Sequence, residues 1–172
     1  MSRGTKTTEY LKECMADALI TLMRTKPIEK ITIPQIVETA GVGRTTWFRH
    51  FTTKSEAITY KFVCMWARWT DEHNVSVKTE FALDNAETFF AYNQSIRHIL
   101  DVVYSAGMQS AVYDAFYAIM QPRDIHAPLE LYKQRFYACG LCGLLDEWVK
   151  RGYQETPQEM AELIPLFAEA KS

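Results

Sequence analysis

Five polar side chains with nucleic-acid-binding chemistry fall within seven positions of this 172-residue chain: Arg44, Thr45, Thr46, Arg49 and His50. An arginine can donate two parallel hydrogen bonds to the edge of a guanine, and a threonine methyl group can contact thymine. Thr46, Arg49 and His50 suit phosphate oxygens, which receive at least half of all protein–DNA hydrogen bonds. These residue types at this spacing favour binding to double-stranded DNA.

Residues 31–54 supply the elements that would position this run. Thr32 is a predicted helix N-cap and Pro34 falls in the first turn, where a missing N–H costs nothing. Gly41 stands where a helix commonly ends in a left-handed residue. A second helix is predicted over 44–51, and its apolar positions are Trp47, Phe48 and Phe51. This pattern predicts a helix-turn-helix, whose second helix enters a major groove with its N-terminal end toward the bases.

Flanking segments complete a small N-terminal domain. Apolar residues at helical spacing predict a helix over 7–24, which Lys26-Pro27 ends. Thr53 with Glu56 forms a predicted capping box for a long connecting helix that extends to about His73. The expected core of the three N-terminal helices is Leu19, Leu22, Ile31, Ile36, Val37, Val42, Trp47 and Phe51.

The remainder of the chain has helical spacing and no strand pattern. Helices are predicted over 81–104, 108–120, 128–151 and 157–170, with a polar loop before them at 74–84. The expected fold class is all-α. A three-helix DNA-binding domain (1–54) would be joined by a long helix to a helical bundle for regulation and dimerisation (55–172).

Composition and charge agree with a globular DNA-binding protein. Apolar residues make up 48% and charged residues 23% of the chain. We expect no membrane span, because no run of about 18 apolar residues occurs, and a cytoplasmic location, because no signal segment is visible. The net charge of -2 is unevenly distributed: residues 1–54 carry nine bases and five acids, or +4, and the rest carries -6. One basic end on an acidic body suits DNA binding, although chance asymmetry explains the charge equally well.

Three segments together carry a family resemblance: ITIPQIVETAGV, then RTTWFRHF, then TKSEA. With this spacing the chain resembles the TetR family of transcriptional regulators. The resemblance implies DNA contacts at the matching positions, and the residues themselves add Arg49. Two residues depart from the family pattern: Phe48 replaces the usual tyrosine and Gly43 replaces a common polar cap. The expected DNA-binding residues are Thr32, Arg44, Thr45, Thr46, Phe48, Arg49, His50 and Lys54.

A C-x-x-C motif at Cys139 and Cys142 lies inside a predicted helix. A redox pair normally sits at a strand-to-helix turn, and no further Cys or His cluster completes a metal site. The favoured alternative is a small-residue face, since two glycines in a helix interior need a packing reason. The resemblance implies a homodimer formed by the last two helices. The expected contacts are Gly140, Leu141, Leu144, Leu145, Trp148, Leu163, Ile164 and Phe167.

Many aromatic residues lie between the N-terminal domain and the expected interface. Any one of them belongs by default to an ordinary core. Together they predict an apolar pocket with a few hydroxyl groups, as in effector sites of the resembled family. The expected lining is Trp66, Trp69, Tyr104, Tyr113, Tyr117 and Tyr137.

The leading hypothesis is a dimeric transcriptional repressor that binds a double-stranded DNA operator and is released by a small apolar or aromatic effector. The alternative is a helical adaptor or co-regulator of the same fold that binds a protein partner and interacts weakly with DNA, for which the departures at Gly43 and Phe48 argue. An enzyme is disfavoured because no nucleophile and base have catalytic spacing. No metal or cofactor is expected.

Overall fold

The computed structural model describes residues 3–75, 86–120 and 127–169. Within these ranges the backbone forms α-helices, one short 3-10 helix and no strand, which confirms the all-α fold class. None of the helices described is long and apolar enough to cross a membrane.

The chain folds into two compact units, which are described separately. The first unit comprises residues 1–65 and 101–115, and the second comprises residues 66–100 and 116–172. Three helices pass from one unit into the other: α4 (Lys54–Glu72), α6 (Arg97–Ser105) and α7 (Gln109–Met120).

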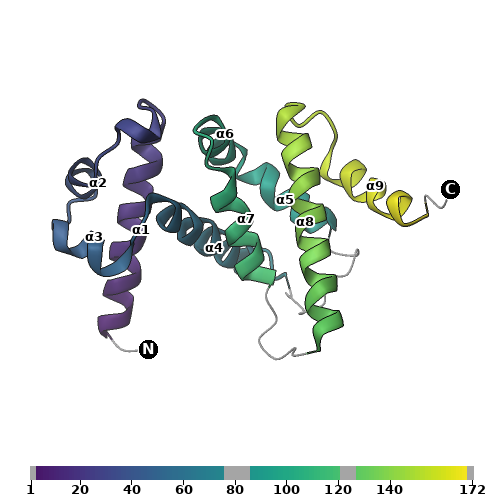
Figure 1. Ribbon diagram of the computed structural model, residues 1–172, viewed down its shortest axis with the longest axis horizontal. Helices are drawn as coiled ribbons and strands as arrows, with labels where there is room; N and C mark the ends of the chain where they lie inside the picture. The colour runs from purple at the N-terminus through teal and green to yellow at the C-terminus, as the bar shows by residue number, and fades with distance from the viewer. Residues whose placement is uncertain (1–2, 76–85, 121–126, 170–172) are drawn as a thin grey trace. The chain divides into compact units, whose positions relative to one another are not determined.

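The first unit is built on a packed trio of helices: α1 (Arg3–Met23), α2 (Ile33–Thr39) and α3 (Arg44–His50) contact one another (Figure 1). A 3-10 turn, η1 (Ile28–Lys30), links α1 to α2. Of the expected core, Leu22 and Val42 are only half-buried. Leu19, Ile31, Ile36, Val37, Trp47 and Phe51 are buried as predicted.

Polar contacts fix the start of α4 to its neighbours in this unit. The ammonium of Lys61 is buried and lies 2.7 Å from a carboxylate oxygen of Asp17 on α1 and 3.7 Å from one of Glu13. The hydroxyl of Thr59 donates to the carbonyl oxygen of Ala111 at 3.0 Å. These bonds hold α4 against both α1 and the first half of α7.

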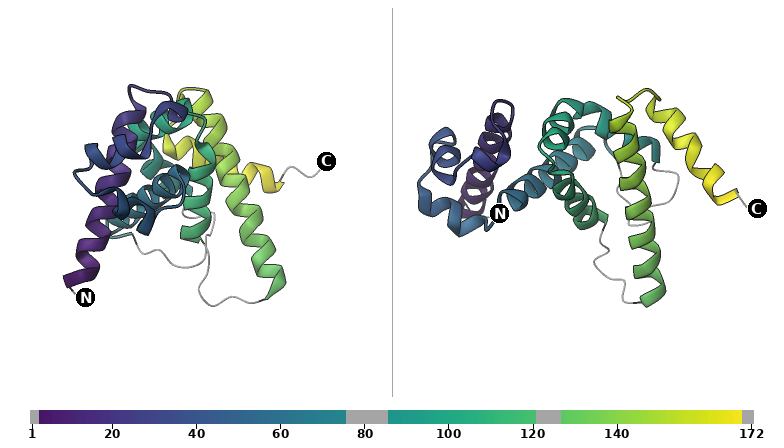
Figure 2. Two further views of the ribbon diagram at one scale, coloured as in Figure 1. Left: turned by 60° about the vertical axis from the view of Figure 1, so that its left-hand side comes forward. Right: turned by 45° about the horizontal axis from the view of Figure 1, so that its top comes forward.

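The second unit has an aromatic core between α5 (Ala86–Ser95), α8 (Pro128–Lys150) and α9 (Pro157–Glu169). Helix α5 packs on α9, and α9 follows α8 after a short turn (Figure 2). Phe90 and Trp148 meet edge to face with ring centroids 5.3 Å apart. The indole N–H of Trp148 donates to the carbonyl oxygen of Glu155 at 2.9 Å, which ties the end of α8 to the turn.

One predicted helix is interrupted. The segment expected to be a single helix over 81–104 contains a break at Ile96, between α5 and α6. The hydroxyl of Ser95 donates to the carbonyl oxygen of Tyr92 at 2.6 Å, a local bond of the kind that competes with helix continuation. Residues 81–85 of that prediction, most of the predicted loop and the break predicted at 121–124 lie outside the described residues.

Candidate nucleic-acid interface

The turn between α2 and α3 is held by capping bonds at both ends of α2. The hydroxyl of Thr32 accepts from the N–H of Gln35 at 3.4 Å, and the Gln35 side chain accepts from the N–H of Thr32 at 3.0 Å. At the other end Gly41 has a φ of +66°, and the N–H of Val42 donates to the carbonyl oxygen of Val37 at 2.9 Å. These bonds fix the direction in which α3 leaves the turn.

Helix α3 is anchored by aromatic side chains on one face. Trp47 is fully buried and Phe51, at its C-cap, is 4% exposed, with ring centroids 5.3 Å apart. Because these rings face the core, the opposite side of the helix is turned outward. There Arg44, Thr45 and Arg49 are exposed. Thr46 and His50 are half-buried at the edge of this outward side. Together with Phe48, six of the expected DNA-binding residues thus lie on α3.

Phe48 differs from the other two apolar residues of the predicted helix, because 60% of it is exposed. The guanidinium carbon of Arg44, one turn earlier, lies 5.9 Å from the centroid of the Phe48 ring. An arginine at this distance over an aromatic ring is attracted by the ring's electron-rich face. Phe48 therefore belongs to the outward surface of α3 and not to the core.

Lys54 begins α4 and has a bond that sequence reasoning missed. Its ammonium donates to the carbonyl oxygen of Ile28 at 2.6 Å, so it fastens α4 to η1. The N-cap predicted at Thr53 is confirmed, because its hydroxyl accepts from the N–H of Glu56 at 3.1 Å. The return bond of the predicted capping box is shifted by one residue: the Glu56 carboxylate accepts from the N–H of Thr52 at 2.7 Å and not from that of Thr53.

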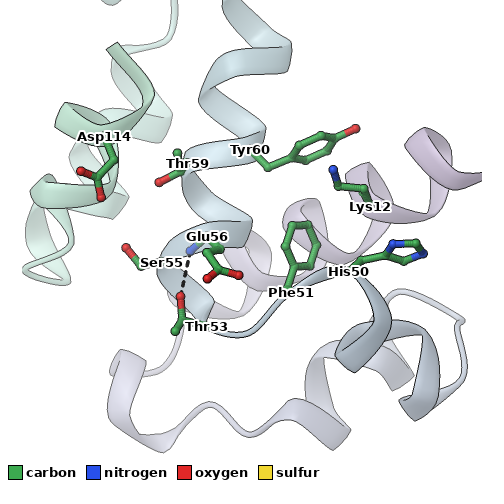
Figure 3. A pocket seen from close by; sticks show the side chains of 9 residues that line it. All are labelled: Lys12, His50, Phe51, Thr53, Ser55, Glu56, Thr59, Tyr60 and Asp114. Atoms are coloured by element: carbon green, nitrogen blue, oxygen red, sulfur yellow. Dashed lines mark hydrogen bonds between the residues drawn. The ribbon is translucent and has the colours of Figure 1, made fainter. Parts of the chain in front are cut away.

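A shallow groove of about 530 Å³ opens beside the C-terminal end of α3 (Figure 3). Its walls combine Phe51 with polar residues of α1, α3, α4 and α7: Lys12, His50, Thr53, Ser55, Glu56, Thr59, Tyr60 and Asp114. The ammonium of Lys12 lies 3.8 Å from the centroid of the Tyr60 ring. Sequence reasoning missed Lys12, because its place at this edge depends on how α1 crosses α4.

Electrostatics at this edge favour a neutral His50 in the free protein. Partial burial lowers the pKa of His50 below its ordinary value, and the positive charges of Lys12 and Arg49 lower it further. The positive charges of Lys12 and Arg49 therefore disfavour a proton on the imidazole until an anion approaches.

Comparison with known proteins supplies the family. A family model described as a transcriptional regulator C-terminal region, of the TetR type, matches residues 79–169. The match covers more than half of the chain and falls outside the N-terminal segments on which the sequence resemblance depends.

The chain belongs to the TetR family of transcriptional regulators. No curated protein sequence matches it.

The six residues expected to line an effector pocket in this TetR-family regulator are divided between the two units. Tyr104 and Tyr113 belong to the first unit and the other four to the second. In the second unit Trp66 and Trp69 stack with ring centroids 6.1 Å apart, and Trp66 is buried. Tyr117 and Tyr137 are exposed, and the guanidinium of Arg135 lies 3.9 Å from the Tyr117 ring centroid. A pocket formed by all six stays a prediction.

The residues expected at a dimer interface separate into inward and outward sets. Leu141, Leu145, Trp148 and Ile164 are buried inside the protomer, where they contribute to the core of the second unit. Leu144 and Leu163 are half-buried and Gly140 is exposed. Phe167 lies in α9, but its side chain is outside the described residues.

The C-x-x-C motif of this regulator lies in the middle of α8. Cys139 is exposed and Cys142 is buried. Burial raises the pKa of the Cys142 thiol to about 12, so almost no thiolate forms there near neutral pH. Among the described residues no group of three or more His, Cys, Asp or Glu side chains is arranged to hold a metal ion.

Proposed function

We propose that this TetR-family regulator binds a palindromic DNA operator as a homodimer, with α3 of each protomer in a major groove. The observation that carries the proposal is the orientation of α3. Trp47 anchors one side in the core, while Arg44, Thr45 and Arg49 project from the other. Direct contact with base edges requires polar groups of this kind on a rigid, outward-facing helix.

The proposed homodimer rests on an apolar stripe along the outer face of α8. Residues spaced by three and four positions recur on this face, and they are exposed: Leu129, Tyr132, Phe136, Gly140 and Gly143. Tyr132 and Phe136 are each 76% exposed, an unusual state for large aromatic side chains. A Cβ atom built on Gly140 or Gly143 would meet none of the described atoms within 4 Å.

Among the parts of the protomer that the structure describes, therefore, no close packing accounts for the two glycines of α8. A second copy of the helix packed against them would account for both, because glycine lets backbones approach closely. The interface that we propose consequently uses this outer stripe, while Leu141, Leu145 and Trp148 support it from behind. A two-fold dimer would present two copies of α3 to two half-sites.

We further propose repression that a small apolar or aromatic ligand relieves. Family membership and the stacked pair Trp66 and Trp69 support this part. Such a ligand acts only if it binds the DNA-free arrangement more tightly than the DNA-bound one. Titrating candidate aromatic ligands while following tryptophan fluorescence and operator release tests it. Release without any binding signal would count against it.

The direct test of DNA binding is Arg44→Ala on a selected operator. We expect an affinity loss of about 1–3 kcal/mol and weaker discrimination at the guanine position. The control is Arg24→Ala, which removes an exposed arginine of the same unit that lies outside α2 and α3. Equal operator affinities of wild type and Arg44→Ala in a gel shift would refute the proposed role of α3.

A second candidate function is an adaptor or co-regulator that interacts weakly with DNA. One observation favours it: Gly43, the N-cap of α3, makes no side-chain cap hydrogen bond. Phe48 also lacks the hydroxyl group with which a tyrosine would bond a phosphate. This candidate predicts specific capture of a protein partner and no preferred DNA sequence.

A further inference from the structure

Arg44 and Phe48 form an exposed pair on α3. The two residues are four positions apart on α3, so their side chains lie on the same side of the helix. Phe48 keeps 60% of its surface exposed, although a phenylalanine gains free energy by burial. The guanidinium carbon of Arg44 lies 5.9 Å from the centroid of its ring.

We propose that Phe48 recognises the methyl group of a thymine and at the same time positions Arg44 for a neighbouring guanine. The proposal rests on the proposed DNA-binding function and assigns part of its sequence specificity. The ligand is thus a thymine and a guanine in the same major groove, contacted by one turn of α3.

The contact with Phe48 leaves the hydrogen-bonding groups of Arg44 available. The guanidinium carbon lies 5.9 Å from the centroid of a ring that has no hydrogen-bonding side-chain atom, so its five N–H donors can still reach a base. Among the described residues no carboxylate pairs with Arg44. The ring restricts the many rotamers of the arginine, and an arginine already ordered loses less entropy when it forms two bonds to a guanine.

The free face and edge of Phe48 are entirely apolar. In the major groove the only apolar group that a base pair presents is the C5-methyl of thymine. A tyrosine at this position would bring a hydroxyl, which can bond a phosphate oxygen. The absence of that hydroxyl removes a backbone contact and leaves apolar contact as the interaction that the ring can offer.

Helix geometry limits how far apart the two bases lie. Four residues advance an α-helix by about 6 Å, whereas successive base pairs are about 3.4 Å apart. If α3 lies along the groove, the thymine falls within about two base pairs of the guanine, on either strand. The proposal thus specifies a spacing as well as two base types.

The test uses wild-type protein and the operator obtained by selection, with deoxyuridine replacing each thymine in turn. This replacement deletes only the C5-methyl group. At one thymine per half-site, within two base pairs of the guanine, we expect an affinity loss of about fourfold, the factor for one buried methylene-sized group. Loss of affinity at no thymine would overturn the proposal.

Variants assign the methyl contact to a side chain. The Phe48→Ala protein should bind the deoxyuridine operator as tightly as the thymine operator. When Arg44→Ala is added to Phe48→Ala, the resulting fold-loss of operator affinity should be at least threefold smaller than the fold-loss that Arg44→Ala causes in the wild-type protein. Thr45→Ser removes a methyl group from the neighbouring exposed residue, which also faces the proposed DNA, and so tests the competing assignment of the thymine contact to Thr45. If Thr45→Ser abolishes the preference and Phe48→Ala does not, the assignment is wrong.

Stability measurements and operator selection distinguish a failure of this inference from unfolding of the variant and from a failure of the proposed function. Since Phe48 is exposed, Phe48→Ala should retain the helical circular dichroism and melting temperature of the wild type, which excludes unfolding as the cause. Selection that yields no operator would defeat the proposed function. Selection that yields an operator indifferent to Phe48→Ala would defeat this inference alone.

Discussion

Replacing Gly143 by alanine should stabilise one protomer while weakening the dimer. Gly143 lies in the regular helix α8, where a Cβ would come within 4 Å of no atom of residues 3–75, 86–120 and 127–169 that the structure describes. Alanine in a helix interior is more favourable than glycine by about 0.5–1 kcal/mol, because glycine loses more backbone entropy on folding. The free energy of unfolding of the isolated protomer should therefore rise by about that amount.

The dimer should respond in the opposite direction if α8 packs there against its two-fold copy. An added methyl group in a well-packed contact costs about 1–3 kcal/mol through overpacking, and the symmetric dimer receives one from each protomer. A total of about 2 kcal/mol, at the low end, corresponds to roughly 30-fold weaker dimerisation. Gly143→Leu should weaken it further.

Sedimentation equilibrium gives the dissociation constant of the dimer. Urea unfolding at protein concentrations below that constant gives the free energy of unfolding of the protomer. Leu131→Ala is the control, because Leu131 is exposed on α8 but turned about 140° from Phe136 and the stripe. It should leave dimerisation unchanged. A Gly143→Ala protein that dimerises as tightly as the wild type would refute the interface that we propose.

Three further predictions follow from individual contacts. Since the pKa of His50 lies below its ordinary value of 6.5, its protonation beside phosphates should strengthen operator binding as pH falls below about 6.5, and His50→Gln should abolish this pH dependence in a fluorescence-anisotropy titration. Thr156→Ala removes the hydroxyl that accepts from the N–H of Glu159 at 3.2 Å at the start of α9; a loss of about 1 kcal/mol should lower the melting temperature by about 2–4 °C, measured by calorimetry. Iodoacetamide at pH 7.5 should modify Cys139 and spare the buried, high-pKa thiol of Cys142, as peptide mass spectrometry would reveal; equal labelling would contradict the burial of Cys142.

Local sequence signals predicted the ends of several helices correctly. Thr32 with Gln35 and Thr156 with Glu159 each form the reciprocal side-chain and backbone bonds of a capping box. Thr53 caps α4 in the same way, although the Glu56 carboxylate bonds the N–H of Thr52. Such bonds join residues three or four positions apart, so the sequence alone contains the whole motif. The same locality explains why the bounds of α3 were predicted to within one residue.

Contacts between distant segments were not predictable in this way. Lys54 bonds to the carbonyl oxygen of Ile28, and the buried ammonium of Lys61 lies beside Asp17, because tertiary packing brings α4 to η1 and α1. Spacing along one helix carries no information about which carbonyl or carboxylate will approach from another element.

Helical periodicity also leaves the partner of an apolar face undetermined. The spacing of leucines in α8 correctly indicated an apolar helix. Leu145 and Trp148, which were expected among the dimer contacts, are buried in the protomer, where the Phe90 ring meets Trp148 edge to face. The exposed stripe through Phe136 and Gly143 emerged only from side-chain exposure. An apolar pattern indicates that a helix face is buried. Whether another helix of the same protomer or a second protomer buries it is determined by three-dimensional packing.

Selection of bound sequences from random duplex DNA, with the wild-type protein at physiological salt, tests the central claim most directly. The account predicts an enriched palindrome whose half-site centres lie about one helical turn, or a multiple of it, apart. It also predicts that Arg44→Ala loses the enrichment while Arg24→Ala retains it. Recovery of no preferred sequence by folded, dimeric wild-type protein would contradict the claim that α3 recognises DNA.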